Sequence, residues 1–174
     1  MQPLSLETER LCIRWLQLDD CGFIHRLLND PDWIRFIGDK SVRNLDDARA
    51  YLESGPLKMY RSLGFGLNRV ALRDSGQAIG ICGILQRDTL PRADLGFAFL
   101  PEYRRRGYAL EAARAVLDHA ATGLGITRLA AILTADNEAS AGLLQKLGFR
   151  YAGPYRAGGN PTELDLYQIE LEIP

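Results

Sequence analysis

The chain has 174 residues, 47% hydrophobic and 25% charged, with a formal net charge of −1, and these values predict a single globular domain over residues 1–174. Such a charge argues against general affinity for nucleic acid, so we expect no nucleic-acid partner. No apolar run approaches the roughly 18 residues of a membrane span, and residues 1–10 lack the basic and apolar parts of a signal peptide. We therefore expect a cytoplasmic protein with no membrane partner.

The first half of the chain is predicted to alternate short strands and helices. The predicted elements are a strand at 11–15, a helix from 19 to about 28, a short aromatic segment at 33–37, a helix from 44 to about 53, a helical turn or loop at 57–63, and a hairpin with strands at 65–72 and 78–85. Asp30-Pro31 ends the first helix because a residue before proline avoids helical angles. Asn44 and Asp47 have the spacing of a capping pair.

The second half is predicted to alternate strand and helix. The predicted elements are a strand at 94–100 closed by Pro101, a helix from 107 to 124, a strand at 128–133, a helix from 137 to 148, a strand at 149–155, a loop at 158–161 and a last strand at 163–173. We expect the long helix to bury one face, formed by Leu110, Ala113, Leu117, Ala120 and Leu124. Strands grouped early and strand–helix alternation later predict an α+β fold with a mixed sheet.

Between the strand at 94–100 and the long helix lies the basic turn Arg104-Arg105-Arg106-Gly107-Tyr108-Ala109. The first amides of a helix have no intrahelical acceptor, and the helix dipole adds positive charge there. Gly107 leaves room for a phosphate, and the arginines supply forked donors. The alternative is a solvated basic loop before an ordinary helix.

Three segments resemble known blocks of one family. PEYRRRGYALEAA resembles the acetyl-CoA-binding signature of the GNAT N-acetyltransferases, Arg/Gln-x-x-Gly-x-Gly/Ala, with Arg104, Gly107 and Ala109 in its fixed positions. The segment from Asn137 to Phe149 is similar to that superfamily's Asn-x-x-Ala-x-x-Leu-Tyr-x-Lys-x-Gly-Phe block. LETERLCIRWLQLDD resembles the N-terminal block of the ribosomal-protein acetyltransferase branch.

The resemblance implies the GNAT fold, with a mixed central sheet of about seven strands that is split between the strand before the basic turn and the strand before Asn137. It also implies acetyl-CoA as co-substrate, bound in the split. The implied cofactor-binding residues are Phe99, Leu100, Arg104, Arg105, Arg106, Gly107, Tyr108, Ala109, Asn137 and Ser140. For Asn137, a plain helix cap is the alternative role, and the two can coexist.

The catalytic groups are less clear in the sequence. Many GNAT enzymes have a tyrosine, which protonates the leaving thiolate, where this chain has Leu144. In the ribosomal-protein acetyltransferases a serine matching Ser140 is proposed to contact the sulfur, so Ser140 is our candidate; the alternative is a helix-start serine bonded to backbone. For the general base, Asp94 and Asp136 both lie near predicted strand ends that face the split. We select Asp94, although an exposed acid is the alternative for each and water can replace either.

The resemblance implies an N-acetyltransferase that acts on a primary amine, either a small molecule or a protein N-terminus, by direct attack on acetyl-CoA. The alternative is a non-catalytic acyl-CoA-binding or sensing protein. We expect the acceptor site between residues 33–37, the loop after Leu85 and the loop at 158–161, in a monomer or homodimer. Cys12, Cys21 and Cys82 are expected to be reduced thiols, and the two distant histidines, His25 and His119, predict no metal site.

Overall fold

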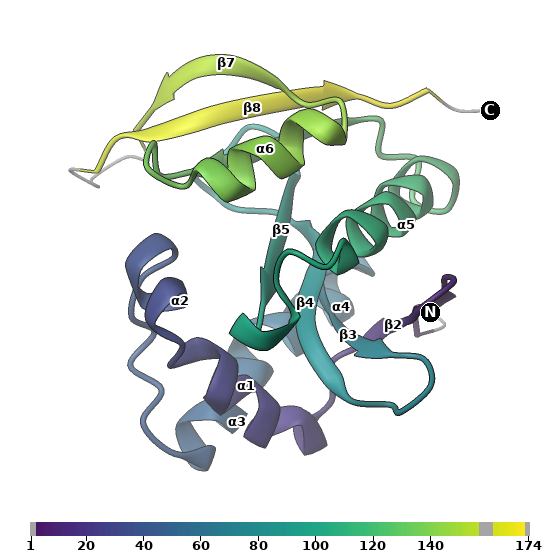
Figure 1. The fold of residues 1–174 in the computed structure, drawn as a ribbon, viewed down its shortest axis with the longest axis vertical. Helices are drawn as coiled ribbons and strands as arrows, with labels where there is room; N and C mark the ends of the chain where they lie inside the picture. Colours follow the sequence, from purple (N-terminus) through teal and green to yellow (C-terminus); the bar gives the residue numbers. More distant parts are fainter. Residues whose placement is uncertain (1–2, 157–161, 173–174) are drawn as a thin grey trace.

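The computed structural model describes residues 3–156 and 162–172 and is built around one mixed sheet of eight strands (Figure 1). In chain order the strands are β1 (Ser5–Glu7), β2 (Leu11–Trp15), β3 (Leu67–Leu72), β4 (Ala78–Leu85), β5 (Asp94–Phe99), β6 (Arg128–Leu133), β7 (Arg150–Tyr155) and β8 (Leu164–Glu170). Their order across the sheet is β1-β2-β3-β4-β5-β6-β8-β7. The mixed α+β architecture predicted from the sequence is confirmed, with eight strands where about seven were expected.

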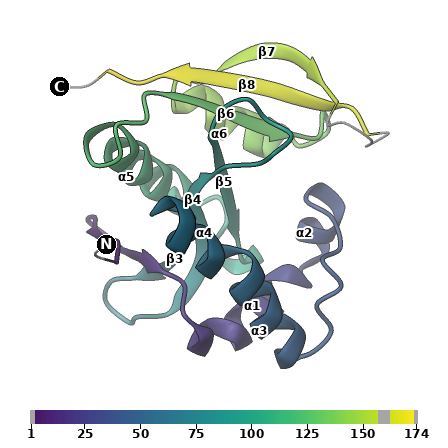
Figure 2. The ribbon, with the colours of Figure 1, turned by 180° about the vertical axis from the view of Figure 1, so that it is seen from behind.

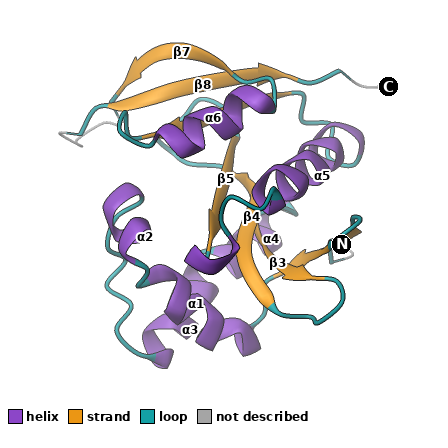
Figure 3. Ribbon diagram, viewed as in Figure 1, coloured by secondary structure: helices purple, strands orange, loops and turns teal. Residues whose placement is uncertain are grey.

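Helices lie on both sides of this sheet (Figure 3). They are α1 (Cys21–Leu28), α2 (Pro31–Phe36), α3 (Leu45–Ser54), α4 (Pro56–Leu63), α5 (Tyr108–Thr122) and α6 (Glu138–Lys146), with 3-10 turns at Leu18–Asp20 and Pro101–Tyr103. Asn44 caps α3 by accepting a bond from the amide of Asp47 at 2.9 Å, as its spacing predicted. No helix among the described residues is long and apolar enough to cross a bilayer.

The aromatic segment after Asp30 is a helix, α2, which the sequence left without a structural assignment. Pro31 is its first residue, where a missing amide hydrogen costs nothing, and the Asp30 side chain accepts a bond from the amide of Trp33 at 3.3 Å. Segment 57–63, expected to be a helical turn or a loop, is helical and belongs to α4.

The strands alternate their side chains between two hydrophobic clusters. Val70 and Cys82 enter the cluster that α5 covers, whereas Leu67 and Ile81, on the same strands, enter the cluster that α1 and α3 cover. The buried face of α5 differs from the predicted one: Leu110 and Leu124 are only half-buried. The residues that it buries are Ala112, Ala113, Val116, Leu117, Ala120 and Ala121. Small alanines let the helix lie close against the sheet, which a count of large apolar residues misses.

All eight strands belong to one sheet, but the pairing between β5 and β6 is very short. These two strands are parallel and share a single registered pair, Asp94 with Ala130, whereas β4 and β5 share six. Beyond that pair, β5 runs away from β6 and β8, which continue together (Figures 1 and 2). This separation lies where the sequence resemblance placed the split.

Candidate active site

Beyond its one registered pair with β6, one backbone edge of β5 faces the split. The amide of Leu100 donates to the carbonyl of Ile79 on β4 at 2.9 Å, and the carbonyl of Ala93 accepts from Ala130 on β6 at 2.9 Å. Because backbone groups in an antiparallel pair alternate sides, Phe97 directs its amide and carbonyl, and Phe99 its amide, toward the split, whereas the Phe99 carbonyl accepts a bond from Arg104 Nε at 2.8 Å. An extended ligand arm can therefore bind there as an added strand. Of the two residues predicted for this role, the structure directs Phe99 to the open edge and the amide of Leu100 to β4.

The basic turn at the end of β5 forms a concave array of amides. Arg105 and Gly107 both have left-handed backbone angles, with φ of 58° and 81°. Alternating left-handed residues turn successive amides inward, and this arrangement binds anions. In the described part of the chain the amides of residues 105–110 have no protein acceptor, while the amide of Glu111 begins the regular helix by donating to Gly107 at 3.1 Å. The turn thus presents free donors at the positive end of α5.

The three arginines of the turn divide into two kinds. Arg105 and Arg106 are exposed and form no ion pair with described residues. Arg104 is directed elsewhere: its Nε donates to the carbonyl of Phe99 at 2.8 Å, and its two terminal nitrogens form ion pairs with Asp30 and Asp32 of α2. Two side chains, not three, are therefore free to contact a phosphate.

A second arginine, which the sequence analysis did not single out, holds the turn from outside. Arg10 lies in the connection between β1 and β2; its Nη1 donates to the carbonyl of Arg106 at 3.0 Å, and its guanidinium lies 4.6 Å from the ring centroid of Tyr108. Its Nε and its amide both donate to the carboxylate of Glu111, which Thr8 also contacts at 2.6 Å. Burial raises the pKa of Glu111, but the bonds from Thr8 and Arg10 outweigh it, and the pKa is lowered overall. Glu111 therefore connects the N-terminal hairpin to the start of α5.

On the other side of the split, Asn137 caps α6. Its side-chain oxygen accepts a bond from the amide of Ser140 at 3.2 Å, so the capping role predicted for Asn137 is present. Ser140 is half-buried in the first turn of α6. Leu144, one turn later, is fully buried in the main core with Phe149. A hydrophobic core position therefore stands where many GNAT enzymes have the tyrosine.

The two candidate bases differ sharply in their surroundings. Asp94 is fully buried at the one place where β5 and β6 pair, and burial raises its pKa to about 6, against the opposing effect of Arg87. One carboxylate oxygen accepts from Arg87 Nε at 3.0 Å, while the other, Oδ1, is buried and has no hydrogen-bond partner among the residues that the structure describes. Asp136 is exposed and pairs with Arg35 of α2 at 2.9 Å. Only Asp94 has the shifted pKa that is typical of a catalytic acid or base.

The expected acceptor region contains both core and surface residues. Trp33 is buried, as the core interpretation of this segment required, whereas Ile34 and Ile37 are each 42% exposed. The loop between β4 and β5 supplies Arg87 and is joined to β7 by a bond from the Tyr155 hydroxyl to the carbonyl of Thr89. The loop predicted at 158–161 lies outside the described residues.

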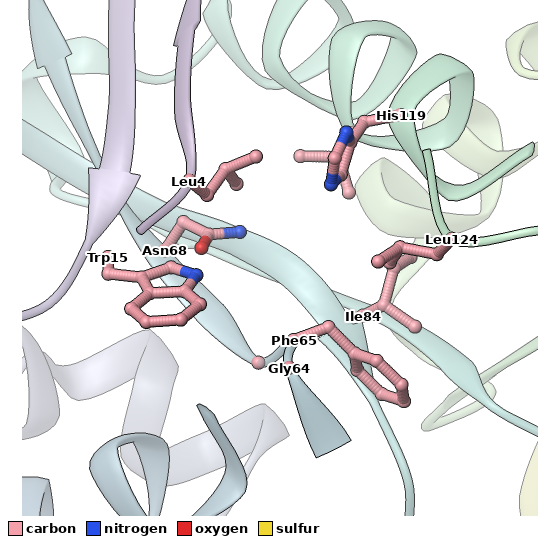
Figure 4. Close-up of a pocket in the computed structure, with 10 residues that line it drawn as sticks. Leu4, Trp15, Gly64, Phe65, Asn68, Ile84, His119 and Leu124 are labelled. Carbon is pink, nitrogen blue, oxygen red and sulfur yellow. The ribbon is translucent and has the colours of Figure 1, made fainter. Parts of the chain in front are cut away.

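A pocket elsewhere on the molecule is not part of this arrangement. Figure 4 shows it between Leu4, Trp15 and Phe65 on one side and His119 on α5 on the other. His119 is 12 residues along α5 from the turn, or about 18 Å at 1.5 Å per residue. Its pKa is lowered by burial. Among the described residues no group of three or more His, Cys, Asp or Glu side chains could hold a metal ion.

Comparison with known proteins agrees with this geometry. Residues 10–150 match the family model described as the acetyltransferase (GNAT) domain. The N-acetyltransferase YoaA of Bacillus subtilis is 29% identical over 173 residues, covering 94% of this chain and 95% of its own. The spermidine N(1)-acetyltransferase of Escherichia coli is 24% identical over 142 residues, covering 81% and 73%.

Among solved structures, the ribosomal L7/L12 alpha-N-protein acetyltransferase RimL, in complex with coenzyme A, superposes with a TM-score of 0.83. The match covers 98% of this chain and 100% of RimL at 14% identity, so it shows a common fold. The split sheet, the amide array at the start of α5 and a family model spanning most of the sequence together establish that the chain belongs to the GNAT acetyltransferases.

Proposed function

We propose that this protein transfers the acetyl group of acetyl-CoA to a primary amine, either a small molecule or a protein N-terminus. The observation that carries the proposal is the continuity between the open backbone edge of β5 and the amide array at residues 105–110. A ligand with an extended amide-containing arm and a diphosphate fits this sequence of donors and acceptors. Acetyl-CoA has both parts.

The chain's own residues have three tasks in this reaction: they hold acetyl-CoA, accept the proton that the amine loses, and stabilise the leaving sulfur. Free amides of the turn, with Arg105 and Arg106, neutralise the diphosphate, while the backbone of Phe97 and the amide of Phe99 align the arm along β5. Acetyl-CoA supplies a thioester carbon; the amine forms a C–N bond to it as the C–S bond breaks.

Two side chains are proposed to handle the protons of this step. The buried Asp94 accepts the proton that the amine loses, and its pKa of about 6 leaves it mostly ionised at pH 7. The Ser140 hydroxyl donates a hydrogen bond to the departing thiolate, which then takes up a proton from water to become a free thiol. Leu144 has no polar group that could donate a hydrogen bond to the sulfur, so Ser140 is the proposed donor on α6.

A direct test follows free thiol while the full-length protein is incubated with acetyl-CoA and a panel of amines and peptides. Amine-dependent thiol release is the expected result. Binding of acetyl-CoA without turnover on any acceptor would support the alternative of a non-catalytic acyl-CoA-binding or sensing protein, which the absence of a tyrosine at position 144 favours.

The role of Ser140 predicts a specific kinetic effect. Ser140→Ala should lower the single-turnover rate by up to about 100-fold and leave coenzyme A affinity nearly unchanged, because the hydrogen bond forms only as charge develops on sulfur. Ser62→Ala, at an exposed position on α4, serves as the control. An unchanged single-turnover rate in Ser140→Ala would show that Ser140 only begins the helix.

A further inference from the structure

The guanidinium of Arg87, beside Asp94, forms fewer hydrogen bonds with the described residues than its donors allow. Arg87 is held by a single bond, from its Nε to Asp94 Oδ2 at 3.0 Å, and its side chain is 42% exposed. Its two terminal nitrogens have no acceptor among the described residues. The buried carboxylate therefore fixes the guanidinium in place while leaving the forked donors free, which is the geometry that binds a carboxylate or phosphate.

Two further side chains interact electrostatically with the same guanidinium. Lys40, in the connection between α2 and α3, is exposed to solvent, and its pKa is lowered by partial desolvation from neighbouring atoms and by repulsion from Arg87. Tyr51 on α3 has its pKa raised by burial, against the opposing effect of Arg87. Lys40 forms no ion pair with any residue that the structure describes. Two cations thus lie near each other without an acidic side chain to neutralise both.

Next to these two cations, Asp94 has an acceptor atom that needs a hydrogen-bond donor. Asp94 Oδ1 is buried and has no hydrogen-bond partner among the described residues, and an unpaired buried acceptor is unfavourable until a donor reaches it. One end of the site therefore needs an N–H donor, and the other end needs an anion. A compound with an amino group and an acidic group a few bonds apart satisfies both ends.

We propose that the acceptor is an amine bearing an anionic oxyacid group close to the amino nitrogen, such as a small amino acid, rather than a polyamine. The amino nitrogen contacts Asp94 Oδ1, and the acidic group contacts Arg87 and Lys40. This inference rests on the proposed function. A polycationic acceptor would bring a second positive charge against Arg87 and Lys40, so these two residues select against it.

The test uses matched acceptors that differ in one group. For several amino acids, kcat/KM is compared between the free acid and its amide, with spermidine as the polycation and an aminoalkyl phosphate as the phosphate counterpart. We expect the free acid to exceed its amide by at least tenfold and to exceed spermidine by more. Preference for the aminoalkyl phosphate over the amino acids would identify the anionic group as a phosphate.

Variants then assign the preference to the proposed residues. Lys40→Met should bring the acid-to-amide ratio several-fold closer to one, whereas Lys58→Met, which removes an exposed lysine on α4, should leave it unchanged. The ratio is insensitive to a general loss of active protein, because both acceptors are affected equally. An amide or spermidine used as well as the free acid, or an unchanged ratio in Lys40→Met, would overturn the proposal.

A binding measurement separates this inference from the proposed function. Calorimetry in the presence of coenzyme A compares an N-acetylated amino acid with its amide, and needs no turnover. Selective binding of the acid, weakened in Lys40→Met, supports the anionic site even if no thiol is released with any amine. Absence of selective binding overturns the anionic site even if other amines are acetylated.

Discussion

At the scale of single residues, Gly107 and Gly76 provide a matched pair. Both are glycines with left-handed backbone angles, φ 81° and 70°, but Gly107 lies in the amide array and Gly76 in the β3–β4 turn. Alanine should cost about 1–2 kcal/mol of folding stability at either position, since side chains disfavour this conformation. A Cβ at Gly107 would also lie 3.3 Å from the Arg10 guanidinium, whereas at Gly76 it would meet nothing within 4 Å.

Gly107→Ala should therefore weaken coenzyme A binding by about tenfold or more, equivalent to about 1.4 kcal/mol, while Gly76→Ala should leave the affinity unchanged. Calorimetry on both folded variants provides the measurement. Equal affinities in the two variants would remove the assignment of the diphosphate to this turn.

Ionisation of Asp94 is expected to increase activity and to decrease folding stability. Its pKa is raised from 3.8 to about 6, so its contribution to folding stability is full below pH 3.8 and is lost as the pH rises through 6. At pH 7 the buried charge costs about 3 kcal/mol, at 1.36 kcal/mol for each pKa unit. kcat/KM should correspondingly fall as the pH is lowered through about 6, because protonated Asp94 cannot accept a proton.

Asp94→Asn should thus reduce kcat/KM by about 100-fold to 10,000-fold and, at pH 7, leave the free energy of unfolding unchanged or higher. Asp136→Asn, which removes an exposed ion pair, should alter stability by no more than about 1 kcal/mol and retain most activity. Kinetics and urea unfolding on both variants test this. A stable, fully active Asp94→Asn variant would assign the proton to water instead.

At the scale of elements, α2 is fastened to the end of β5 by charge. Arg104 joins the carbonyl of Phe99 to Asp30 and Asp32, but the Asp30 side chain is 5% exposed and the Asp32 side chain 52%. Breaking a buried pair leaves an uncompensated charge, whereas an exposed pair is largely replaced by water.

Asp30→Asn should therefore lower the free energy of unfolding by about 1–3 kcal/mol, less than for a fully buried pair because the Arg104 side chain is 31% exposed. Asp32→Asn should lower it by less than about 1 kcal/mol. Urea denaturation at pH 7 distinguishes the two. Similar losses in both variants would contradict the unequal roles of these carboxylates.

The elements that the sequence predicted well were those with local signals. The alternation at Leu11–Trp15, the cap at Asn44 and the glycine before α5 all act within a few residues, and each occurs as predicted. β1 has three residues and no alternation to detect. The ion pair between Arg10 and Glu111 joins residues that are 101 positions apart in the sequence, and the ion pair between Arg104 and Asp30 joins residues that are 74 positions apart. No spacing rule predicts such contacts, so the difference between the paired Arg104 and the exposed Arg105 and Arg106 required the folded chain.

At the scale of the whole molecule, charge is local rather than general. The net charge is −1, yet Arg105 and Arg106 are exposed at the start of α5 without ion-pair partners among the described residues. Coenzyme A affinity should therefore fall as salt is raised from 0.05 to 0.5 M, because exposed charges are screened over a shorter distance. DNA should bind weakly at physiological ionic strength. Titrations at several salt concentrations provide the test, and salt-independent coenzyme A binding would contradict it.

The single registered pair between β5 and β6 also has a consequence for aggregation. Unpaired strand edges are templates on which other chains add strands, and proteins usually cover or charge the outer edges of their sheets. Here an open edge lies within the sheet, along Phe97 and Phe99. A bound ligand arm covers that edge and, at 100 times its Kd, stabilises the folded state by about 2.7 kcal/mol. Under the proposed function, coenzyme A adds a strand to this edge, and we expect the ligand-free protein to aggregate more readily than the protein with coenzyme A bound.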